Sequence, residues 1–316
     1  MQLIRGFHNA AADPRGCALT VGTYDGIHLG HRALLERLAA HAHERAVPAL
    51  MLTFEPTPRE YLQSADPPAR LTSFRERWRC LAGGELAGLL VLRFGAATRA
   101  LTGEAFAQLL AGRLRPAVVV VGHDFRFGRD GAGTAEGLCA AGRRLGFEVD
   151  VVEPVLLAGE RVSSSAIREA LARRDLAGAA RLLGRPYSMR GRVVRGQQLG
   201  RTLGYPTANV LLHRCRSPLA GIFAVRVRGA APAALPGVAS LGTRPTVGGV
   251  EPWLETHIFD FDRDLYGREI EVEFVAHLRE ELHFASVDAM VQQIHRDAAQ
   301  ARGILACPPA GAAGRT

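Results

Sequence analysis

The chain has 316 residues, 47% of them hydrophobic, and carries a formal net charge of +8. This length suits two domains of ~150 residues, each large enough to bury a core. All 39 basic residues are arginines, which excludes enzymes that depend on a P-loop lysine, a protein-kinase strand lysine or a Schiff-base lysine. The arginines are spread along the chain and favour small polyanionic substrates, while RNA binding is the alternative that charge alone leaves open.

No apolar stretch approaches the ~20 residues needed to cross a bilayer. The first 16 residues also lack the long apolar segment of a signal peptide. We therefore expect a cytoplasmic protein with no membrane partner. The five cysteines are scattered and never form a CxxC pair, which argues against a disulfide framework or a zinc site.

The first distinctive segment, 22–35, is a glycine-rich turn that leads into a helix. Residues 18–21 before it are apolar and predict a buried strand. Leu34, Leu35 and Leu38 recur at helical spacing and predict the helix. The order is therefore strand, tight turn, helix.

Two histidines, His28 and His31, flank Gly30 where this helix is expected to begin. Free backbone N–H groups and the positive end of the helix dipole make such a start a natural phosphate site. Gly30 lets the backbone approach a ligand closely, and the imidazoles can donate hydrogen bonds to phosphoryl oxygens as charge develops. The HxGH pattern resembles the signature of the nucleotidylyltransferase superfamily. The alternative is a surface turn with solvated histidines.

Strands and helices alternate along the rest of the first half, which predicts an α/β fold with a doubly wound parallel sheet and ligands at the carboxyl ends of its strands. The continuous apolar run of 116–122 is typical of a strand buried on both faces. Further strands are expected at 48–54, 88–94 and 147–153, and helices near 74–81, 102–114 and 135–145.

The loop at 123–134 follows that apolar run and combines aromatic and charged side chains with glycines. Phe125 and Phe127 alternate around Arg126. Their rings could form the walls of a site for a flat ligand ring, while Arg126 or Arg129 binds a phosphate. The alternative is a glycine-rich loop that two phenylalanines anchor.

Three serines open a predicted helix within 160–171. Ser163 or Ser164 is a candidate N-cap, and capping alone is one interpretation. The other interpretation adds Arg168, one turn into the helix. Hydroxyls, helix N–H groups and a guanidinium would together form a cradle for triphosphate.

The segments GTYDGIHLGH, VGHDFRFGRDGAG and VSSSAIR, in this order and spacing, resemble the FMN adenylyltransferase half of prokaryotic FAD synthetases. The sequence departs from the family pattern where Tyr24 replaces Phe, Ser165 replaces Thr and Ala166 stands in place of a frequent Arg. The resemblance implies catalytic roles for His28 and His31. It also implies ATP or phosphate binding by Gly22, Tyr24, Asp25, Gly30, Ser163, Ser164, Ser165 and Arg168, and flavin contacts by Asp124, Phe125 and Phe127.

From about residue 185 the sequence changes to short strands between Gly and Pro turns, which predicts a small antiparallel β-barrel. A final helix at 286–302 is expected to pack on it through Met290, Val291 and Ile294. The strands are expected within 189–196, 221–229, 235–242, 253–261 and 269–278. We therefore expect domains at 1–184 and 185–306, followed by a disordered tail at 307–316.

A glycine-rich loop follows the first strand of this predicted barrel. Gly196, Gly200 and Gly204 make it able to fold over phosphates, and Pro206 fixes the chain before the next strand. The alternative is a glycine-rich hairpin whose polar side chains only satisfy turns.

Strand alternation after this loop points Thr207 and Asn209 to the same side. A hydroxyl and an amide oxygen suit Mg²⁺, which prefers hard oxygen ligands and keeps phosphate oxygens in its coordination shell. On the predicted strand 253–261, Glu255 and His257 also share one face. A carboxylate beside a primary alcohol can take its proton during attack on a γ-phosphate, although an exposed strand residue is the alternative for Glu255.

The motifs GRVVRGQQLGRTLGYPTANV, GVASLGTRPTVGG and LETHIFDFDRDLYGREIEVEFVAHLREE closely resemble the riboflavin kinase half of the same enzymes. The resemblance implies Mg²⁺–nucleotide binding by Thr207 and Asn209, a general-base role for Glu255 and a flavin contact for Arg279. It also implies ATP or phosphate binding by Gly196, Gly200, Arg201, Gly204 and Pro206.

Together the resemblances cover nearly the whole chain and imply an enzyme with two activities. It would use ATP and Mg²⁺ to convert riboflavin to FMN, and a second ATP to convert FMN to FAD. One rival hypothesis keeps only the kinase and treats the first half as a degenerate binding module, with Thr23 and Ala166 as its hints. The other is RNA binding through the arginines, which would show a steep salt dependence.

Overall fold

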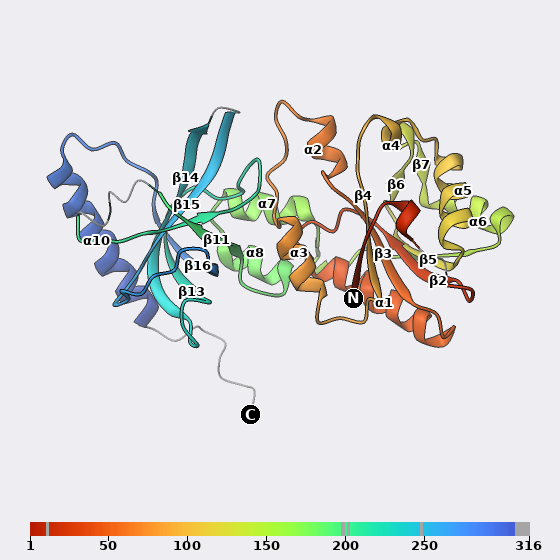
Figure 1. Ribbon diagram of the computed structural model, residues 1–316, viewed down its shortest axis with the longest axis horizontal. Helices are drawn as coiled ribbons and strands as arrows, with labels where there is room; N and C mark the ends of the chain where they lie inside the picture. The colour runs from red at the N-terminus through yellow and green to blue at the C-terminus, as the bar shows by residue number, and fades with distance from the viewer. Residues whose placement is uncertain (11–12, 197–199, 201–202, 247–248, 307–316) are drawn as a thin grey trace. The chain divides into compact units, whose positions relative to one another are not determined.

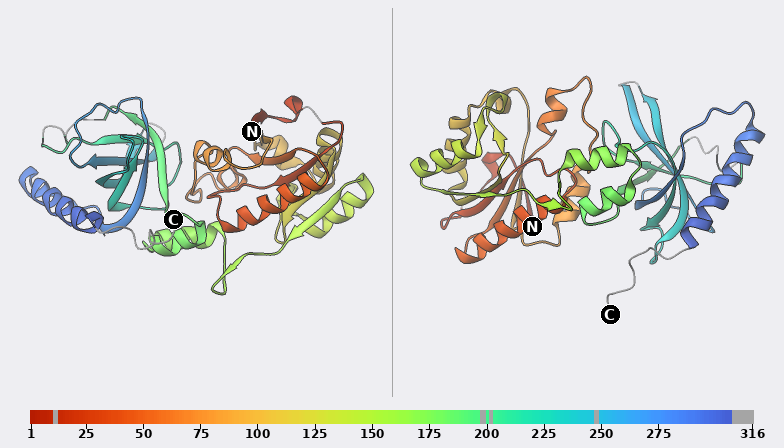
Figure 2. Two further views of the ribbon diagram at one scale, coloured as in Figure 1. Left: turned by 90° about the horizontal axis from the view of Figure 1, so that it is seen from below. Right: turned by 180° about the vertical axis from the view of Figure 1, so that it is seen from behind.

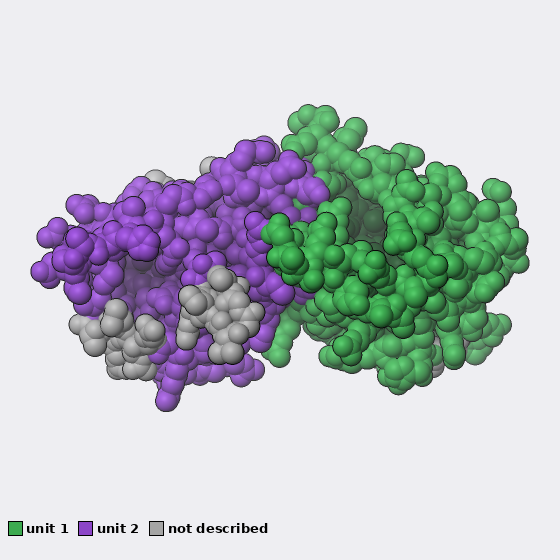
Figure 3. All heavy atoms as spheres, turned by 90° about the horizontal axis from the view of Figure 1, so that it is seen from above, with its two compact units in different colours: residues 1–68, 74–164 green, residues 69–73, 165–316 purple. Residues whose placement is uncertain are grey.

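The computed structural model describes residues 1–10, 13–196, 200, 203–246 and 249–306. The chain folds into two compact units. The first comprises Met1–Pro68 and Phe74–Ser164, and the second comprises Ala69–Ser73 and all residues from Ser165 onward (Figure 3). The expected disordered tail, 307–316, lies outside the described residues.

The first unit is built on a six-stranded parallel sheet with the strand order β1-β4-β3-β2-β5-β8. This confirms the predicted doubly wound sheet. From β2 the chain proceeds through β3 and β4 on one side, whereas β5 and β8 lie on the other. The strands are β1 (Gln2–Arg5), β2 (Cys17–Val21), β3 (Ala49–Phe54), β4 (Gly88–Leu92), β5 (Pro116–Gly122) and β8 (Glu148–Val152).

Helices cover both faces of this sheet (Figures 1 and 2). Side chains alternate across it, so that Leu19 and Val119 face one hydrophobic core while Ala18 and Val118 face the other. The first core includes side chains of α5 and α6, and the second includes side chains of α1 and α3. The helices are α1 (Leu29–Glu44), α2 (Pro58–Leu62), α3 (Phe74–Leu81), α4 (Ala96–Ala100), α5 (Gly103–Leu114) and α6 (Ala135–Leu145).

The loops of this unit contain several short helices and strands. They are the 3-10 helices η1 (Phe7–Asn9) and η2 (Arg129–Gly131), the paired strands β6 (Arg126–Phe127) and β7 (Gly133–Thr134), and the paired strands β9 (Leu156–Leu157) and β10 (Glu160–Arg161).

The second unit contains a closed antiparallel barrel with the strand order β11-β12-β15-β14-β13-β16, which confirms the predicted barrel. Residues such as Phe223, Leu241 and Leu254 are fully buried in it. The strands are β11 (Ser188–Val194), β12 (Ala208–Leu211), β13 (Gly221–Arg228), β14 (Leu235–Thr246), β15 (Gly249–Ile258) and β16 (Glu269–Arg279). Helices α7 (Ser164–Ala172) and α8 (Leu176–Leu183) precede the barrel, and α8 packs against β16.

The C-terminal helix α10 (Val287–Ala306) lies against the barrel (Figure 1). Its buried apolar residues are Ala298, Ala301 and Leu305. The expected stripe of Met290, Val291 and Ile294 is only half-buried. The helix therefore packs through its second half, where Ala298, Ala301 and Leu305 continue the predicted stripe at helical spacing. None of the helices in the described ranges is both long enough and apolar enough to cross a membrane.

Candidate functional sites

The turn between β2 and α1 lies at the point where the strand order reverses, because β2 and β5 are neighbours in the sheet. The carboxyl ends of strands at such a switch point form the usual ligand crevice of doubly wound sheets. His28 is the N-cap of α1, and its Nδ1 accepts a hydrogen bond from the backbone N–H of His31 at 3.2 Å. In a neutral ring the N–H of His28 therefore lies at Nε2.

The two histidine rings stack with centroids 3.6 Å apart, and the Tyr24 ring packs against His31 at 4.8 Å. Burial, together with the electrostatic effects of the neighbouring His28 and Arg77 side chains, holds the pKa of His31 well below its ordinary value. His31 is therefore a neutral hydrogen-bond donor near neutral pH. A Cβ at Gly30 would lie 3.2 Å from the His28 ring, so the glycine leaves room for this stacked pair.

The turn is tied to the neighbouring strand and to the start of α7. Tyr24 hydrogen-bonds Thr20, whose hydroxyl donates to the Val120 carbonyl on β5 at 2.7 Å. Burial raises the pKa of the Tyr24 hydroxyl, which keeps it protonated. The Ser164 hydroxyl donates to the carbonyl of buried Asp25 at 2.9 Å. This bond brings two of the three predicted adenylyltransferase motifs together within the first unit.

The other predicted phosphate-binding residues of this half differ in how far they are exposed and in what they contact. Gly22 follows β2 directly, and a Cβ there would lie 2.9 Å from the Tyr24 ring. Ser163 is half-buried and Ser165 is exposed at the start of α7. The Arg168 Nε donates to the Ala69 carbonyl at 2.6 Å, and both of these residues belong to the second unit.

The loop after β5 holds the predicted flavin-contacting residues. The Phe125 and Phe127 rings stack at 5.3 Å and pack against the first hydrophobic core, as the anchoring alternative predicts. Arg129 donates to the Ala100 carbonyl at 2.9 Å, whereas Arg126 is exposed. Contact of the two phenylalanines with a flat ligand ring stays a prediction.

Asp124, the third residue of that prediction, forms an ion pair with Arg161 at 2.6 Å. Burial opposes the charge on Asp124, but the hydrogen bond and charge of Arg161 outweigh it, and the pKa of the carboxyl is lowered. Asp124 is therefore a fixed negative charge beside the carboxyl end of β5.

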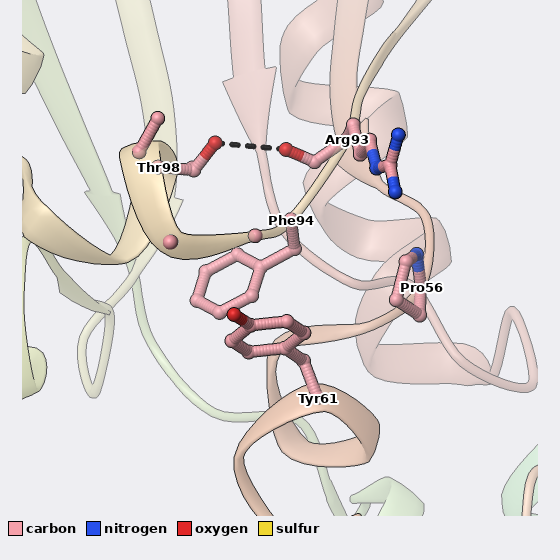
Figure 4. A pocket seen from close by; sticks show the side chains of 8 residues that line it. Pro56, Tyr61, Arg93, Phe94 and Thr98 are labelled. Atoms are coloured by element: carbon pink, nitrogen blue, oxygen red, sulfur yellow. Dashed lines mark hydrogen bonds between the residues drawn. The ribbon is translucent and has the colours of Figure 1, made fainter.

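A pocket of about 450 Å³ opens beyond the carboxyl ends of β3 and β4 (Figure 4). Pro56, Tyr61, Arg93 and Phe94 line it together with the start of α4. Figure 4 shows the Tyr61 and Phe94 rings side by side, with centroids 5.6 Å apart and planes inclined at 71°. The sequence motifs gave no indication of this pocket, because Tyr61 lies on α2 and Phe94 follows β4, and only the packing of these segments brings the two rings together.

The barrel brings two of the predicted kinase residues into one row. Asn209 on β12 lies directly opposite Glu255 on β15, which in turn lies opposite Ser240 on β14. Directly opposed residues of an antiparallel pair place their side chains on the same face. The Trp253 indole N–H donates to Glu255 Oε1 at 2.7 Å, so it orients the carboxylate. Trp253 was not predicted, although its place two residues before Glu255 on the same strand was a signal.

The Asn209 amide is buried, and its Oδ1 has no hydrogen-bond partner within the described part of the chain. A Cβ at Gly196 would collide with this amide, so the glycine lets the backbone lie directly against it. Thr207 is half-buried two residues earlier. An orphaned amide oxygen and a nearby hydroxyl fit a Mg²⁺ ion that takes its remaining ligands from phosphate and water. In the described ranges no cluster of three or more His, Cys, Asp or Glu residues forms a metal site.

The remaining loop residues before β12 are partly described. Gly200 accepts hydrogen bonds from the backbone N–H groups of Leu203 and Tyr205, and Gly204 is exposed. The Pro206 carbonyl lies 2.9 Å from His257 Nδ1, which joins this segment to β15. Arg201 lies outside the described residues.

Arg279 has a protein partner in this structure. Its guanidinium forms a two-pronged ion pair with buried Asp297 of α10, with N–O distances of 2.7 to 3.0 Å. One further N–H donates to the Glu280 carbonyl at 2.8 Å. These contacts attach α10 to β16, and the predicted flavin contact of Arg279 is not tested by them.

Comparison with known proteins gives full-length matches. The FAD synthetase family model matches residues 10–166, and the riboflavin kinase family model matches residues 183–305. A bifunctional riboflavin kinase/FMN adenylyltransferase of Escherichia coli K12 is 46% identical over 304 residues, which are 96% of this chain and 97% of the relative. The protein of that description from Haemophilus influenzae is 42% identical over 306 residues, covering 96% and 99%.

A solved structure from Streptococcus pneumoniae, described as a macrolide-efflux protein, matches with a TM-score of 0.76 and 31% sequence identity. The match covers 94% of this chain and 97% of that one. The similarity therefore extends over both compact units.

Proposed function

Because the chain belongs to the family of bifunctional riboflavin kinases/FMN adenylyltransferases, we propose that it phosphorylates riboflavin to FMN and then adenylylates FMN to FAD. Each step uses one ATP, and the second releases pyrophosphate. The observation that carries the proposal is the match of two different family models to separate halves of one chain.

We assign the kinase step to the row on β12 and β15. Glu255 takes the proton of the ribityl 5′-hydroxyl while that oxygen bonds to the γ-phosphorus of ATP. The bond from this phosphorus to the ADP oxygen breaks, and ADP leaves. Trp253 holds one carboxylate oxygen of Glu255, which leaves the other free to face the substrate.

Thr207 and Asn209 would hold Mg²⁺, and the orphaned Asn209 Oδ1 supports this assignment. When bound, the ion would neutralise charge on the phosphates of ATP. Gly196, Gly200, Arg201, Gly204 and Pro206 belong to the segment that we assign to the nucleotide phosphates, and the close approach of Gly196 to Asn209 supports it.

We assign the adenylyl transfer to the turn between β2 and α1. A phosphate oxygen of FMN bonds to the α-phosphorus of ATP, and the bond from this phosphorus to the pyrophosphate oxygen breaks. His28, His31 and the first N–H groups of α1 donate to the phosphoryl oxygens as charge builds up on them. Positioning and electrostatics suffice for both steps, so neither needs a covalent enzyme intermediate. We assign Ser163, Ser164, Ser165 and Arg168 to the pyrophosphate end of ATP.

Two places compete for the flavin ring in the adenylyl-transfer step. The first is the predicted pair Phe125 and Phe127, which is stacked and packed against the core. The second is the pocket lined by Tyr61 and Phe94, whose volume of about 450 Å³ lies in the range of small-molecule sites. The open pocket is the better supported, because a ring can enter it without displacing core side chains. Replacing Tyr61 by Ala should raise the KM for FMN more than replacing Phe125 does.

We place the functional boundary near residue 185, with adenylyl transfer assigned to 1–184 and the kinase to 185–306. The riboflavin kinase match beginning at residue 183 supports this boundary. The compact units instead divide after Ser164, so α7 and α8 fold with the barrel.

We also place the enzyme in the cytoplasm, because Cys17, Cys80, Cys139 and Cys215 are all free thiols, as is usual in reducing compartments.

The proposal excludes nucleic acid as a partner. Neither of the two matching family models, FAD synthetase and riboflavin kinase, is described as acting on nucleic acid. Chromatography of riboflavin incubated with the protein, ATP and Mg²⁺ tests the function directly. FMN followed by FAD is the expected result. FMN alone would restrict the function to the kinase, and neither product would refute the proposal. Steeply salt-dependent binding to arbitrary RNA would then favour the RNA alternative.

A further inference from the structure

Arg77 on α3 is a buried cation beneath the turn that carries His28 and His31. Only 2% of its surface is exposed. A buried guanidinium is costly unless hydrogen bonds and a counter-ion compensate its charge. Its NH1 lies 2.5 Å from the Thr23 carbonyl and 3.1 Å from the Thr53 hydroxyl, and its NH2 lies 2.5 Å from Glu55 Oε2. These compensating contacts come from the turn, from Thr53 on β3 and from Glu55, the first residue after β3.

The Thr23 carbonyl belongs to a turn that needs support from outside. Tyr24 and Ile27 both adopt left-handed backbone conformations, with φ of 52° and 42°. Such conformations persist in residues other than glycine only where the surrounding structure holds them. The Thr53 hydroxyl donates to the same carbonyl at 3.4 Å. Arg77 on α3 and Thr53 on β3 thus both hydrogen-bond the Thr23 carbonyl, one residue before Tyr24, the first residue of the turn with a left-handed backbone conformation.

We propose that Arg77 is a positioning residue of adenylyl transfer: by holding the Thr23 carbonyl it fixes the turn that aligns His28 and His31 with the phosphates. The proposal rests on the function assigned above. The Arg77 side chain is 3% exposed, so it is too deeply buried to bind ATP itself. It acts through the turn, which places the two imidazoles and the first N–H groups of α1.

The charge of Arg77 has a second effect on the same turn. The groups that face His31 are His28, Tyr24 and Arg77, and Glu55 partly balances the arginine. A positive neighbour disfavours protonation of an imidazole. Removing the charge of Arg77 should therefore raise the pKa of His31 and move the acid limb of FAD formation to higher pH.

The test is the steady-state rate of FAD formation from FMN by the full-length wild type, Arg77→Met and Arg77→Lys. Misplacing reacting groups by about 1 Å can cost about 100-fold in rate, so we expect about a 100-fold lower kcat for Arg77→Met. The KM for FMN should change less than about threefold, because the flavin-binding residues are untouched. Arg77→Lys keeps the charge and one donor, and should lose only about tenfold.

Glu55→Gln is the matched control, because it removes the ion pair but leaves the guanidinium on Thr23. Its kcat should stay within about threefold of the wild type. Thermal unfolding of each variant establishes that the sample is folded at the assay temperature. The acid limb should move to higher pH in Arg77→Met and stay in place in Arg77→Lys, a shift that a purely structural role would not produce.

A folded Arg77→Met variant with wild-type kcat and pH profile would overturn the proposal. If Arg77→Met does not fold, Arg77→Lys decides, and an unchanged kcat in that variant overturns it equally. A loss in Glu55→Gln as large as that in Arg77→Met would assign the effect to the ion pair and also refute the role of the Thr23 contact. Absence of FAD formation by the wild type would instead refute the function on which the proposal rests.

Discussion

The two candidate sites of this protein are built in opposite ways. The adenylyl-transfer site centres on one contiguous turn. His28 is the N-cap of α1, His31 lies in the first turn of this helix, and the two rings stack on each other. The kinase site is a row across separate strands, where the register of the barrel sets Asn209 opposite Glu255. The catalytic groups of the first site lie on one short segment, which distant residues such as Arg77 support, whereas those of the second are brought together by long-range strand pairing. Each site should therefore fail independently when its own residues are changed.

The largest expected effect is on the kinase site. Replacing Glu255 by Gln removes the proposed base, and general-base catalysis typically contributes 10²–10⁴-fold, so FMN formation should fall by about 1,000-fold. FAD formation from supplied FMN should persist in the same sample. Replacing Glu251, exposed on the same strand, by Gln is the matched control and should leave both rates unchanged. Equal loss in both variants would remove Glu255 from the mechanism.

For the turn between β2 and α1 the opposite result is expected, namely loss of FAD formation with FMN formation retained. Replacing His31 by Ala removes one neutral donor to the phosphates, and the loss of one such donor typically costs 10²–10³-fold. FAD formation should therefore fall by about 300-fold while FMN formation continues. Replacing His43, which is exposed near the end of the same helix, by Ala should change neither rate. Normal FAD formation by the His31 variant would end the assignment of this turn.

Comparing two C-terminal fragments tests where the second region begins. The fragment 165–316 keeps α8, whose Leu182 and Leu183 are buried, whereas 185–316 loses both side chains. Each buried leucine contributes about 1.5–3 kcal/mol, so the shorter fragment should have a free energy of unfolding about 3 kcal/mol lower. Urea denaturation followed by circular dichroism measures the difference. Equal stabilities would favour a structural boundary at residue 185.

The smallest expected effect concerns orientation of the base. Replacing Trp253 by Phe keeps an aromatic ring but removes the indole donor to Glu255. A hydrogen bond to a charged group contributes about 1.5–3 kcal/mol, part of which solvent can replace, so FMN formation should slow by about tenfold. FAD formation from FMN is the internal control. An unchanged rate of FMN formation would show that Glu255 needs no support from its strand neighbour.

Much of this architecture could be predicted from sequence because local patterns specify it. The apolar run 116–122 became the buried strand β5, and the alternating segments after residue 188 became the barrel. The place of His28 at the start of α1 also followed from the order of strand, glycine-rich turn and helix. Even the stripe on α10 was correct in phase, although its buried part lies closer to the C-terminus than expected.

By itself, then, the sequence determined the two fold types and the segments that carry the predicted chemistry, because strand and helix periodicity and contiguous motifs are local properties. Only the tertiary structure decided which distant side chains support those segments. Arg77 reaches a carbonyl 54 positions earlier in the chain, Tyr61 and Phe94 meet because β3 and β4 are neighbours, and Arg279 binds Asp297 because α10 packs on the barrel. Such contacts depend on how elements pack, which no local spacing encodes.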